Sequence, residues 1–203
     1  TLFNIVSGLE PADAGQVILD GRDVTGQAGL FAYMPQRDLL LPWRTLLDNV
    51  ILGAELAGRR RQQARQEARG LLPLFGLEGF ERNYPATLSG GMRQRAALLR
   101  TFLFQRDVLL LDEPFGALDA LTRAGMQQWL LEVWAQLSRT ILFITHDVEE
   151  AVFLSDRVYV LTARPARVQL ELPIALSRPR RRDLVTSPSF IALKRRLLEA
   201  VML

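Results

Sequence analysis

Two runs of consecutive hydrophobic residues stand out from the pattern of hydrophobic and polar positions. One lies within residues 107–112 and leads into the carboxylates of Asp112 and Glu113, and the other lies within 140–145 and leads to His146. Apolar runs of this length are typical of strands buried on both faces, as in a parallel sheet. We therefore expect two buried strands, each ending in polar side chains.

Helical spacing of hydrophobic residues surrounds these strands. A helix at 89–104, apolar on one side at Ala96, Leu99 and Leu103, precedes the first strand, and helices at 121–137 and 148–154 flank the second. This strand–helix alternation between 89 and 161 predicts an α/β fold with a parallel sheet. The other expected helices cover 1–8, 45–75 with a break near Gly58, and 188–203, and Thr45 can cap the second of these. The other expected strands cover 16–20 with a partner after Arg22, 30–34, and a hairpin of 157–161 with 168–172.

Composition limits the kinds of site that this chain can form. The 203 residues are 49% hydrophobic, enough for one substantial core. There is no cysteine, which excludes disulfides, thiolate nucleophiles and cysteine metal sites. No apolar run reaches the roughly 20 residues of a membrane-spanning helix.

The net charge is +3, and arginines cluster at 59–61, 178–182 and 195–196. Such clusters occur on surfaces that bind nucleic acid or anionic lipid, and more often on a solvated face or tail. We favour the solvated face, because acidic residues nearly balance the basic ones.

Asp112 and Glu113 are the first candidates for chemistry. Open α/β sheets bind their ligands at the carboxyl ends of the strands, which is where these two carboxylates fall. Charges at the end of a buried strand are costly unless they meet a cation or hydrogen-bond donors. A magnesium nucleotide would supply such a partner.

Ser89, Gly90 and Gly91 form a second candidate site. Ser89 is a favourable helix N-cap, and the two glycines leave their backbone N–H groups open at the helix N-terminus, where anions bind. A plain capped turn is the alternative interpretation. With two carboxylates about twenty residues downstream, we favour phosphate binding.

Five motifs together resemble those of ABC transporter ATPases. Leu88–Gly91 resembles the signature motif, and Val108–Glu113 resembles the Walker B strand with its catalytic glutamate. Gly116–Asp119 resembles the D-loop, His146 the switch histidine, and Gln36 the glutamine of the Q-loop. The motifs follow the family's order and cover essentially the whole chain. The resemblance implies a P-loop NTPase (RecA-like) α/β core, a partial antiparallel β lobe and a helical lobe at about 40–90, all in one domain of residues 1–203.

The resemblance also implies roles for individual residues. Asp112 would hold Mg²⁺ through water, and Glu113 would act as the general base that polarises the attacking water. His146 would contact the γ-phosphate of ATP, and Gln36 would reach Mg²⁺ or the water. Asp119 would organise the dimer contact, although a cap for the following helix is an alternative role.

Ser89, Gly90 and Gly91 would serve another nucleotide. In this family two subunits pair head to tail, so the signature helix of each subunit caps the ATP held by its partner. Each chain therefore carries complementary halves of two sites, consistent with two-fold symmetry.

The P-loop of the family, G-x-x-x-x-G-K-[ST], does not occur in these residues. The opening Thr1–Leu9 resembles the helix that directly follows a P-loop, with Thr1 as the next residue after the P-loop's own Ser or Thr. We therefore expect an N-terminal truncation after the P-loop, rather than a degenerate ATPase. We expect these 203 residues alone to bind ATP weakly and to hydrolyse little.

Several segments resemble bacterial importers of nitrate, sulfonates, taurine and related solutes, among them Leu88–Arg95 and Thr145–Ala151. This implies a peripheral subunit on the cytoplasmic face of the inner membrane, with permease subunits and, indirectly, a solute-binding protein as partners. Leu39–Leu41 and Trp43 are candidates for permease contact or, equally, for the core of the helical lobe. The alternatives are a soluble ABC ATPase acting on nucleic acid or ribosomes, and a non-catalytic partner subunit or fragment; we expect no nucleic-acid partner.

Overall fold

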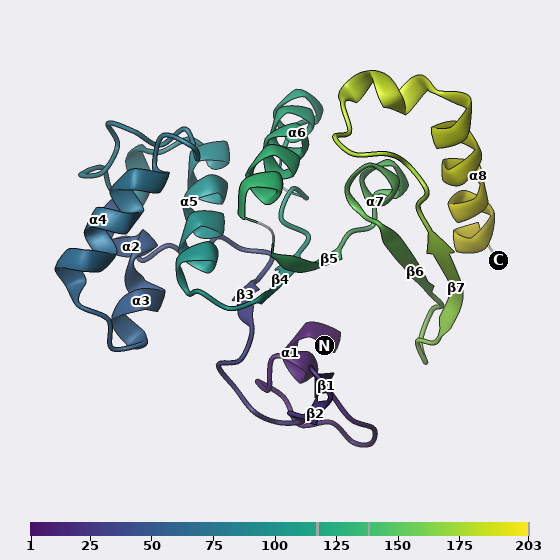
Figure 1. The fold of residues 1–203 in the computed structure, drawn as a ribbon, viewed down its shortest axis with the longest axis horizontal. Coiled ribbons are helices and arrows are strands. Elements are labelled where there is room, and N and C mark those ends of the chain that lie inside the picture. Colours follow the sequence, from purple (N-terminus) through teal and green to yellow (C-terminus); the bar gives the residue numbers. More distant parts are fainter. Residues whose placement is uncertain (117, 138, 203) are drawn as a thin grey trace. The chain divides into compact units, whose positions relative to one another are not determined.

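The computed structural model describes residues 1–116, 118–137 and 139–202 (Figure 1). The chain forms two compact units. The first comprises Thr1–Leu118 and Leu137–Ile144, and the second comprises Asp119–Gln136 and Thr145–Leu203. Each unit is described by itself below.

A parallel three-stranded sheet forms the centre of the first unit. Its order is β3 (Ala32–Met34), β4 (Val108–Asp112) and β5 (Thr140–Ile144). The middle of β4 is buried on both faces, because Leu109, Leu110 and Leu111 are at most 1% exposed. The prediction of a buried parallel strand at 107–112 is therefore confirmed.

The prediction that 140–145 is an equally buried strand is wrong. The strand exists as β5, but Leu142 is 40% exposed and Thr140 is also exposed. The physical reason is position: among the described residues, β5 pairs only with β4 and so lies at an edge of this sheet. A run of apolar residues predicts a strand without telling whether both of its sides are covered.

A small N-terminal layer packs near β4. It comprises helix α1 (Leu2–Val6) and two short antiparallel strands, β1 (Ile18–Leu19) and β2 (Arg22–Asp23). Phe3 of α1 joins Val24, Phe31 and Leu110 in one buried cluster. The expected opening helix and partial antiparallel β lobe are present.

A helical region lies between β3 and β4 in the sequence. It contains α2 (Leu46–Val50), α3 (Leu52–Leu56), α4 (Arg61–Leu71), a 3₁₀ turn at Pro85–Thr87 and α5 (Gly90–Leu103). The expected cap of α2 is confirmed, because Thr45 Oγ1 accepts a hydrogen bond from the Asp48 backbone N–H at 3.3 Å. The predicted buried face of α5 is also confirmed: Ala96, Leu99 and Leu103 are at most 1% exposed.

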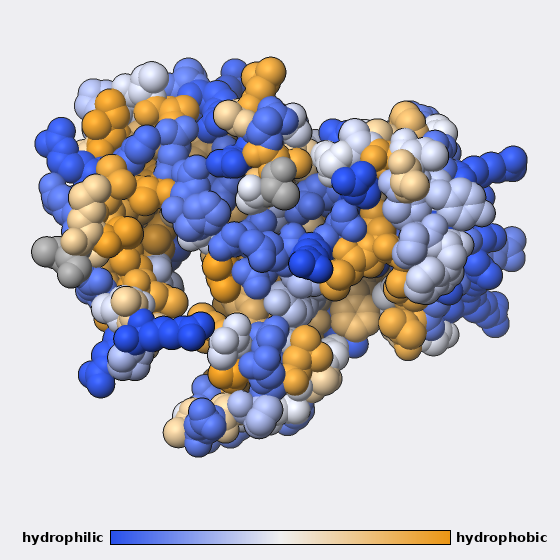
Figure 2. Space-filling model, turned by 180° about the vertical axis from the view of Figure 1, so that it is seen from behind, coloured by the Kyte–Doolittle hydropathy of each residue, from blue (hydrophilic) through white to orange (hydrophobic). Residues whose placement is uncertain are grey.

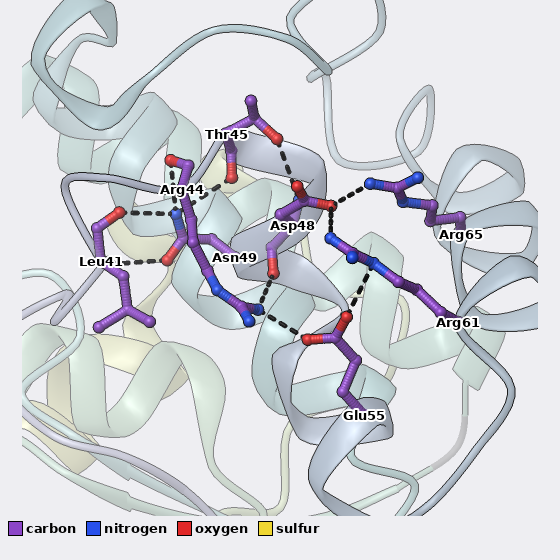
Figure 3. Close-up of polar contacts among 8 residues, drawn as sticks. All are labelled: Leu41, Arg44, Thr45, Asp48, Asn49, Glu55, Arg61 and Arg65. Atoms are coloured by element: carbon purple, nitrogen blue, oxygen red, sulfur yellow. Dashed lines mark hydrogen bonds and ion pairs between the residues drawn. The ribbon is translucent and has the colours of Figure 1, made fainter.

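Charged side chains connect these short helices to one another. The Asp48 carboxylate accepts from Arg61 at 3.1 Å and from Arg65 at 2.6 Å, and Glu55 pairs with both Arg44 and Arg61 (Figure 3). Burial works to raise the pKa of Asp48, but the two arginines outweigh it and hold that pKa below its usual value. The helices of this region are thus stabilised by polar contacts as well as by packing.

The second unit combines a β ribbon with helices. It contains α6 (Ala120–Leu137, except its last residue), α7 (Val148–Leu154), the antiparallel strands β6 (Arg157–Leu161) and β7 (Val168–Pro173), a 3₁₀ turn at Arg182–Thr186 and α8 (Pro188–Met202). Its core includes Phe153, Phe190 and Leu197. Around the C-terminal helix, hydrophobic patches alternate with hydrophilic ones at the surface (Figure 2). The hairpin of β6 and β7 is confirmed. The alternation of strands and helices between 89 and 161 had indicated that β6 belongs to the parallel sheet, but within the described residues β6 pairs with β7 instead. Of the expected last helix, Leu203 lies outside the described residues.

Acidic side chains of the same chain neutralise much of the arginine clusters at 59–61 and 178–182. Arg178 and Arg180 contact Asp156, and Arg182 contacts Glu149. In the helical region, Arg59 pairs with Glu67 and Arg61 with Asp48. No described helix combines the length and apolar character needed to cross a bilayer.

Candidate functional site

Asp112 and Glu113 lie where β4 ends, as the sequence predicts. Asp112 is the last residue of the strand, and Glu113 adopts a left-handed backbone with φ +43°. The Glu113 N–H donates to the Ile144 carbonyl at 3.0 Å, which ties this turn to the end of β5. Such a backbone is unfavourable for a residue with a side chain and occurs preferentially at functional sites. The turn aims the two neighbouring carboxylates differently from a continuing strand.

Gln36 lies beside Glu113. Because β3 and β4 are parallel and Met34 is in register with Leu111, both strands end at the same edge of the sheet. The Gln36 Nε2 donates to Glu113 Oε2 at 3.0 Å. The structure thus brings together two predicted site residues that are 77 positions apart in the sequence.

Tyr33 is a site residue that the sequence analysis missed. Its hydroxyl lies 3.3 Å from Asp112 Oδ2 and 3.3 Å from Asn4 Oδ1. Burial, followed by the negative charge of Asp112, raises the pKa of Tyr33, so the hydroxyl keeps its proton and can donate. The available signal was a tyrosine in the strand that leads to Gln36. Thr1 is exposed in front of α1, and α1 reaches this site through Asn4.

The predicted cap at the start of α5 is also present. Ser89 Oγ accepts a hydrogen bond from the Met92 N–H at 3.2 Å, and Ser89 and Gly90 are exposed. Further along the same helix, Gln94 Nε2 donates to the carbonyl of Pro114. The helix that carries the signature motif is therefore tied to the residue that follows Glu113.

The oxygen donors of this site suit a hard cation that also binds phosphates. Mg²⁺ is usually held by one or two carboxylates together with substrate phosphates and water. Asp112 provides one such carboxylate, with Glu113 adjacent. Among the described residues, no group of three histidine, cysteine or acidic side chains is placed to hold a metal by itself. The residues fit a magnesium ion that arrives with a nucleotide.

Asp119 and His146 belong to the second unit. Asp119 Oδ1 accepts from the Thr122 N–H at 3.0 Å and so caps α6, which is the alternative role considered for it. Hydrogen bonds from the side chain and the backbone of Thr122 lower the pKa of Asp119. His146 lies between Thr145 and Asp147, and the Asp147 N–H donates to Thr145 Oγ1 at 3.0 Å. Within the predicted D-loop, Ala117 lies outside the described residues.

Contacts from α6 support the loop of His146. Asp147 Oδ1 accepts from the Glu150 N–H at 3.0 Å and caps α7, and its other oxygen is 3.5 Å from Arg123 Nη1. One turn further along α6, Gln127 Nε2 donates to Glu150 Oε1 at 2.8 Å. The residues that follow His146 are thus held by contacts with α6 and with the first turn of α7, within one unit.

Glu150 makes the stability of this region pH-dependent. Only 4% of Glu150 is exposed, and burial raises its pKa above the ordinary 4.5, although hydrogen bonds from Thr145 and Gln127 act in the opposite direction. The folded protein therefore holds this proton more tightly than the unfolded chain. The free energy of unfolding should then fall as the pH rises from about 4.5 through the raised pKa.

We expect Glu150→Gln to remove this part of the pH dependence, because glutamine still offers an oxygen to Gln127 and carries no charge. The variant should melt at a higher temperature than the wild type at pH 7, with a smaller difference at pH 4.5. Circular dichroism melting curves would measure this, with the exposed Glu132→Gln as control. The same decline with pH in both Glu150→Gln and wild type would assign the effect to another group.

Comparison with known proteins gives the same family at the level of sequence. The ABC transporter family matches residues 1–116. An uncharacterized ABC transporter ATP-binding protein of Methanocaldococcus jannaschii is 45% identical over 98% of this chain and 73% of its own length. The formylaminopyrimidine import ATP-binding protein ThiZ of Halalkalibacterium halodurans is 44% identical over 88% of this chain and 70% of its own. The taurine import ATP-binding protein TauB of Escherichia coli is 40% identical over 99% and 81%.

Solved structures give the same result for the fold. A dimeric ATP-binding cassette in a post-hydrolysis state with ADP and Pi aligns with a TM-score of 0.70 and 26% identity, over 87% of this chain and 80% of the other. The α/β nucleotide-binding fold predicted from the sequence is therefore confirmed.

Proposed function

The chain belongs to the ABC transporter family, as an ABC ATPase, and from this premise we propose that it is the ATP-hydrolysing subunit of an importer for a small solute such as nitrate, a sulfonate or taurine. The observation that carries the proposal is the hydrogen bond from Gln36 to Glu113 beside Asp112. It unites two family motifs from separate strands at the ligand-binding edge of the sheet. The taurine and formylaminopyrimidine import relatives support the importer assignment.

The proposed roles at this edge follow from charge and geometry. ATP with Mg²⁺ would supply the phosphoryl group and neutralise part of its charge. Asp112 would bind the metal through water, with its carboxylate oriented by Tyr33. Glu113 would accept a proton from the attacking water, and Gln36 would orient Glu113 or that water. Phosphoryl transfer requires mainly positioning and charge stabilisation, which this set of side chains provides.

The remaining motifs would act around this centre. His146 would donate to the γ-phosphate, and the contacts of Asp147 and Glu150 would keep its loop in place. Ser89, Gly90 and Gly91 would cap the nucleotide of a second copy of the chain, paired head to tail, and Asp119 would contribute to that dimer contact. The dimeric cassette with ADP and Pi supports pairing of this kind.

We place the permease contact on the segment between Gln36 and α2. Leu39 is 56% exposed and Trp43 is 72% exposed, whereas Leu40 is only 8% exposed. Leu40 therefore serves the core of the helical region. Leu39 and Trp43 are the hydrophobic side chains of this segment that are free to meet a membrane subunit at the cytoplasmic face, with a solute-binding protein as the indirect partner. Exposed hydrophobic residues of this kind often mark interaction sites.

The test is co-purification of the complete gene product with the permease encoded beside it. We expect a complex whose ATPase activity rises when the solute-loaded binding protein is added. Trp43→Ala should weaken the complex about tenfold or more while leaving the fold intact, because a large exposed aromatic residue is a frequent hot spot. The matched control is Leu56→Ala, which removes another exposed hydrophobic side chain, 78% exposed, on α3. Failure to bind any adjacent permease would contradict the importer assignment.

A soluble ATPase acting on nucleic acid remains the second candidate, and its support is weaker than the sequence indicated. The arginine clusters were its basis, and Arg178, Arg180 and Arg182 have acidic partners inside the chain. Binding of the gene product to DNA or RNA at physiological salt would favour this candidate.

A further inference from the structure

The segment 36–41, which begins with the Q-loop glutamine, is held at both ends. At its start, Gln36 donates to Glu113. At its end, Leu41 exchanges two hydrogen bonds with the side chain of Asn49 on α2: its N–H donates at 2.7 Å and its carbonyl accepts at 3.0 Å (Figure 3). Asn49 is fully buried and also donates to the carbonyls of Arg44 and Thr45. One end of the segment is therefore fixed to Glu113, directly after β4, and the other end is fixed to α2 of the helical region.

A third attachment holds the middle of the segment, and it comes from α5. The guanidinium of Arg100 donates through Nη2 to the Asp38 carbonyl at 2.5 Å and through Nη1 to the Leu39 carbonyl at 2.8 Å. From the same helix, Arg93 Nε lies 3.2 Å from Asp38 Oδ2. The other oxygen of Asp38 accepts from the Leu40 N–H at 3.1 Å. Two arginines of the signature helix thus bind two successive residues of the Q-loop segment, Asp38 and Leu39.

The backbone that Arg100 contacts is strained at Leu39. Leu39 has φ +45°, in the left-handed region that is unfavourable for a residue with a branched side chain. This conformation persists only where the surroundings impose it, and the fork of Arg100 binds the carbonyl of that residue and the one before it. Lysine has a single ammonium group without the planar fork and cannot reproduce two fixed, parallel donors. The contact therefore depends on arginine specifically.

Helix α5 connects Arg100 to the signature motif at its N-terminus. Arg100 lies eleven residues after Ser89, a distance of about 16 Å along a helix. Between them, Gln94 donates to the Pro114 carbonyl, next to Glu113. Helix α5 thus contacts the Q-loop segment and the turn after Glu113, and its own N-terminus carries the residues proposed to cap the partner's nucleotide.

We infer that Arg100 is a positioning residue for ATP hydrolysis: it fixes the Q-loop segment to the signature helix, so that Gln36 at the subunit's own site and Ser89 at its partner's site keep one relative placement. This inference rests on the proposed function. Arg100 itself does not have to touch the nucleotide. Its effect passes through Asp38 and Leu39 to Gln36, two positions earlier in the chain.

The test compares Arg100→Lys with Arg106→Lys in the complete gene product. Arg106 is a matched control, because its Nε also donates to a backbone carbonyl, that of Gly29 at 2.6 Å, away from the motifs. We expect Arg100→Lys to lower kcat about fivefold or more with KM for ATP changed less than kcat. Arg106→Lys should leave kcat unchanged. An equal loss of kcat in both variants would show a general effect on folding and would overturn the inference.

A second measurement does not depend on activity. Hydrogen exchange of the amides at 38–41 should become faster in Arg100→Lys, while the helical amides of α4 keep their wild-type rates. Unchanged exchange at 38–41 would overturn the inference, since Arg100 would then not hold the segment.

A double-mutant cycle with Gln36→Ala tests the path itself. If Arg100 acts through Gln36, the double variant should lose little more kcat than Gln36→Ala alone. Independent, additive losses would overturn the inference. Absence of Glu113-dependent hydrolysis in the wild type would overturn the proposed function together with the inference, whereas wild-type kcat in Arg100→Lys would overturn the inference alone.

Discussion

Glu113→Gln should abolish turnover while preserving ATP binding. We expect kcat of the complete gene product to fall by about 100-fold or more, the loss typical when a general base is removed. Glutamine retains an oxygen that can accept from Gln36, so the local geometry is kept and only the basic carboxylate is lost. With ATP bound and hydrolysis blocked, the protein should accumulate as a dimer. Size-exclusion chromatography in MgATP and a phosphate-release assay would measure both effects.

Asp107→Asn is the matched control for this substitution. Asp107 precedes β4 at its opposite end and is fully exposed, so the same loss of a carboxylate there should leave kcat unchanged. Normal turnover in Glu113→Gln would show that another group accepts the proton and would remove Glu113 from the catalytic role.

A mixed dimer of Glu113→Gln and Gly90→Asp subunits should be active, although each variant alone is inactive. In the proposed head-to-tail pairing, Glu113 of one chain would lie opposite the signature helix of the other, so the mixed dimer would have one site with both lesions and one intact site. We expect about half of the wild-type rate, because one of two equivalent sites survives. Differently tagged subunits, co-expressed and purified through both tags, would provide the mixed dimer for the phosphate-release assay.

Gly90→Asp suits this experiment because it should fold. A Cβ at Gly90 would meet its first neighbour, Arg93 Nη2, at 3.9 Å, and a carboxylate at a helix N-terminus is locally stabilising. The new charge would instead repel the phosphates of the partner's nucleotide. Gly70→Asp, at another open position of a helix, is the control and should keep full activity. An inactive mixed dimer, with both homodimers also inactive, would mean that Glu113 and Gly90 serve a site within one chain.

Helix ends and strand positions followed from local chemistry and were predicted well. Thr45 and Ser89 accept a backbone N–H at the start of a helix, as predicted, because a short polar side chain satisfies a donor that the helix leaves open. The burial of β5 was predicted wrongly, because it depends on what lies beside the strand: Leu142 and Thr140 are exposed at the sheet edge. The difference is one of range: caps involve residues three positions apart, whereas burial involves the whole sheet.

The candidate site shows the same division. Asp112, Glu113 and Gln36 were identified from their motifs, and Ser89 from its cap and the glycines after it. Tyr33 was missed, because its value arises from a hydroxyl placed beside Asp112 across two strands. The hydrogen bonds from Arg100 to the carbonyls of Asp38 and Leu39 could not be predicted either, since an arginine in an amphipathic helix does not indicate which carbonyls it will contact.

The sequence by itself determined the family, the order of the motifs and the chemical nature of each candidate residue, because these depend on residue type and on short spacings. Only the tertiary structure decided which of these residues meet. Parallel pairing of β3 with β4 brings Gln36 to Glu113, and the approach of α5 to the segment 36–41 brings Arg100 to two carbonyls. Such contacts join residues that are about 60 to 80 positions apart, where loop closure and packing, rather than local preference, set the geometry.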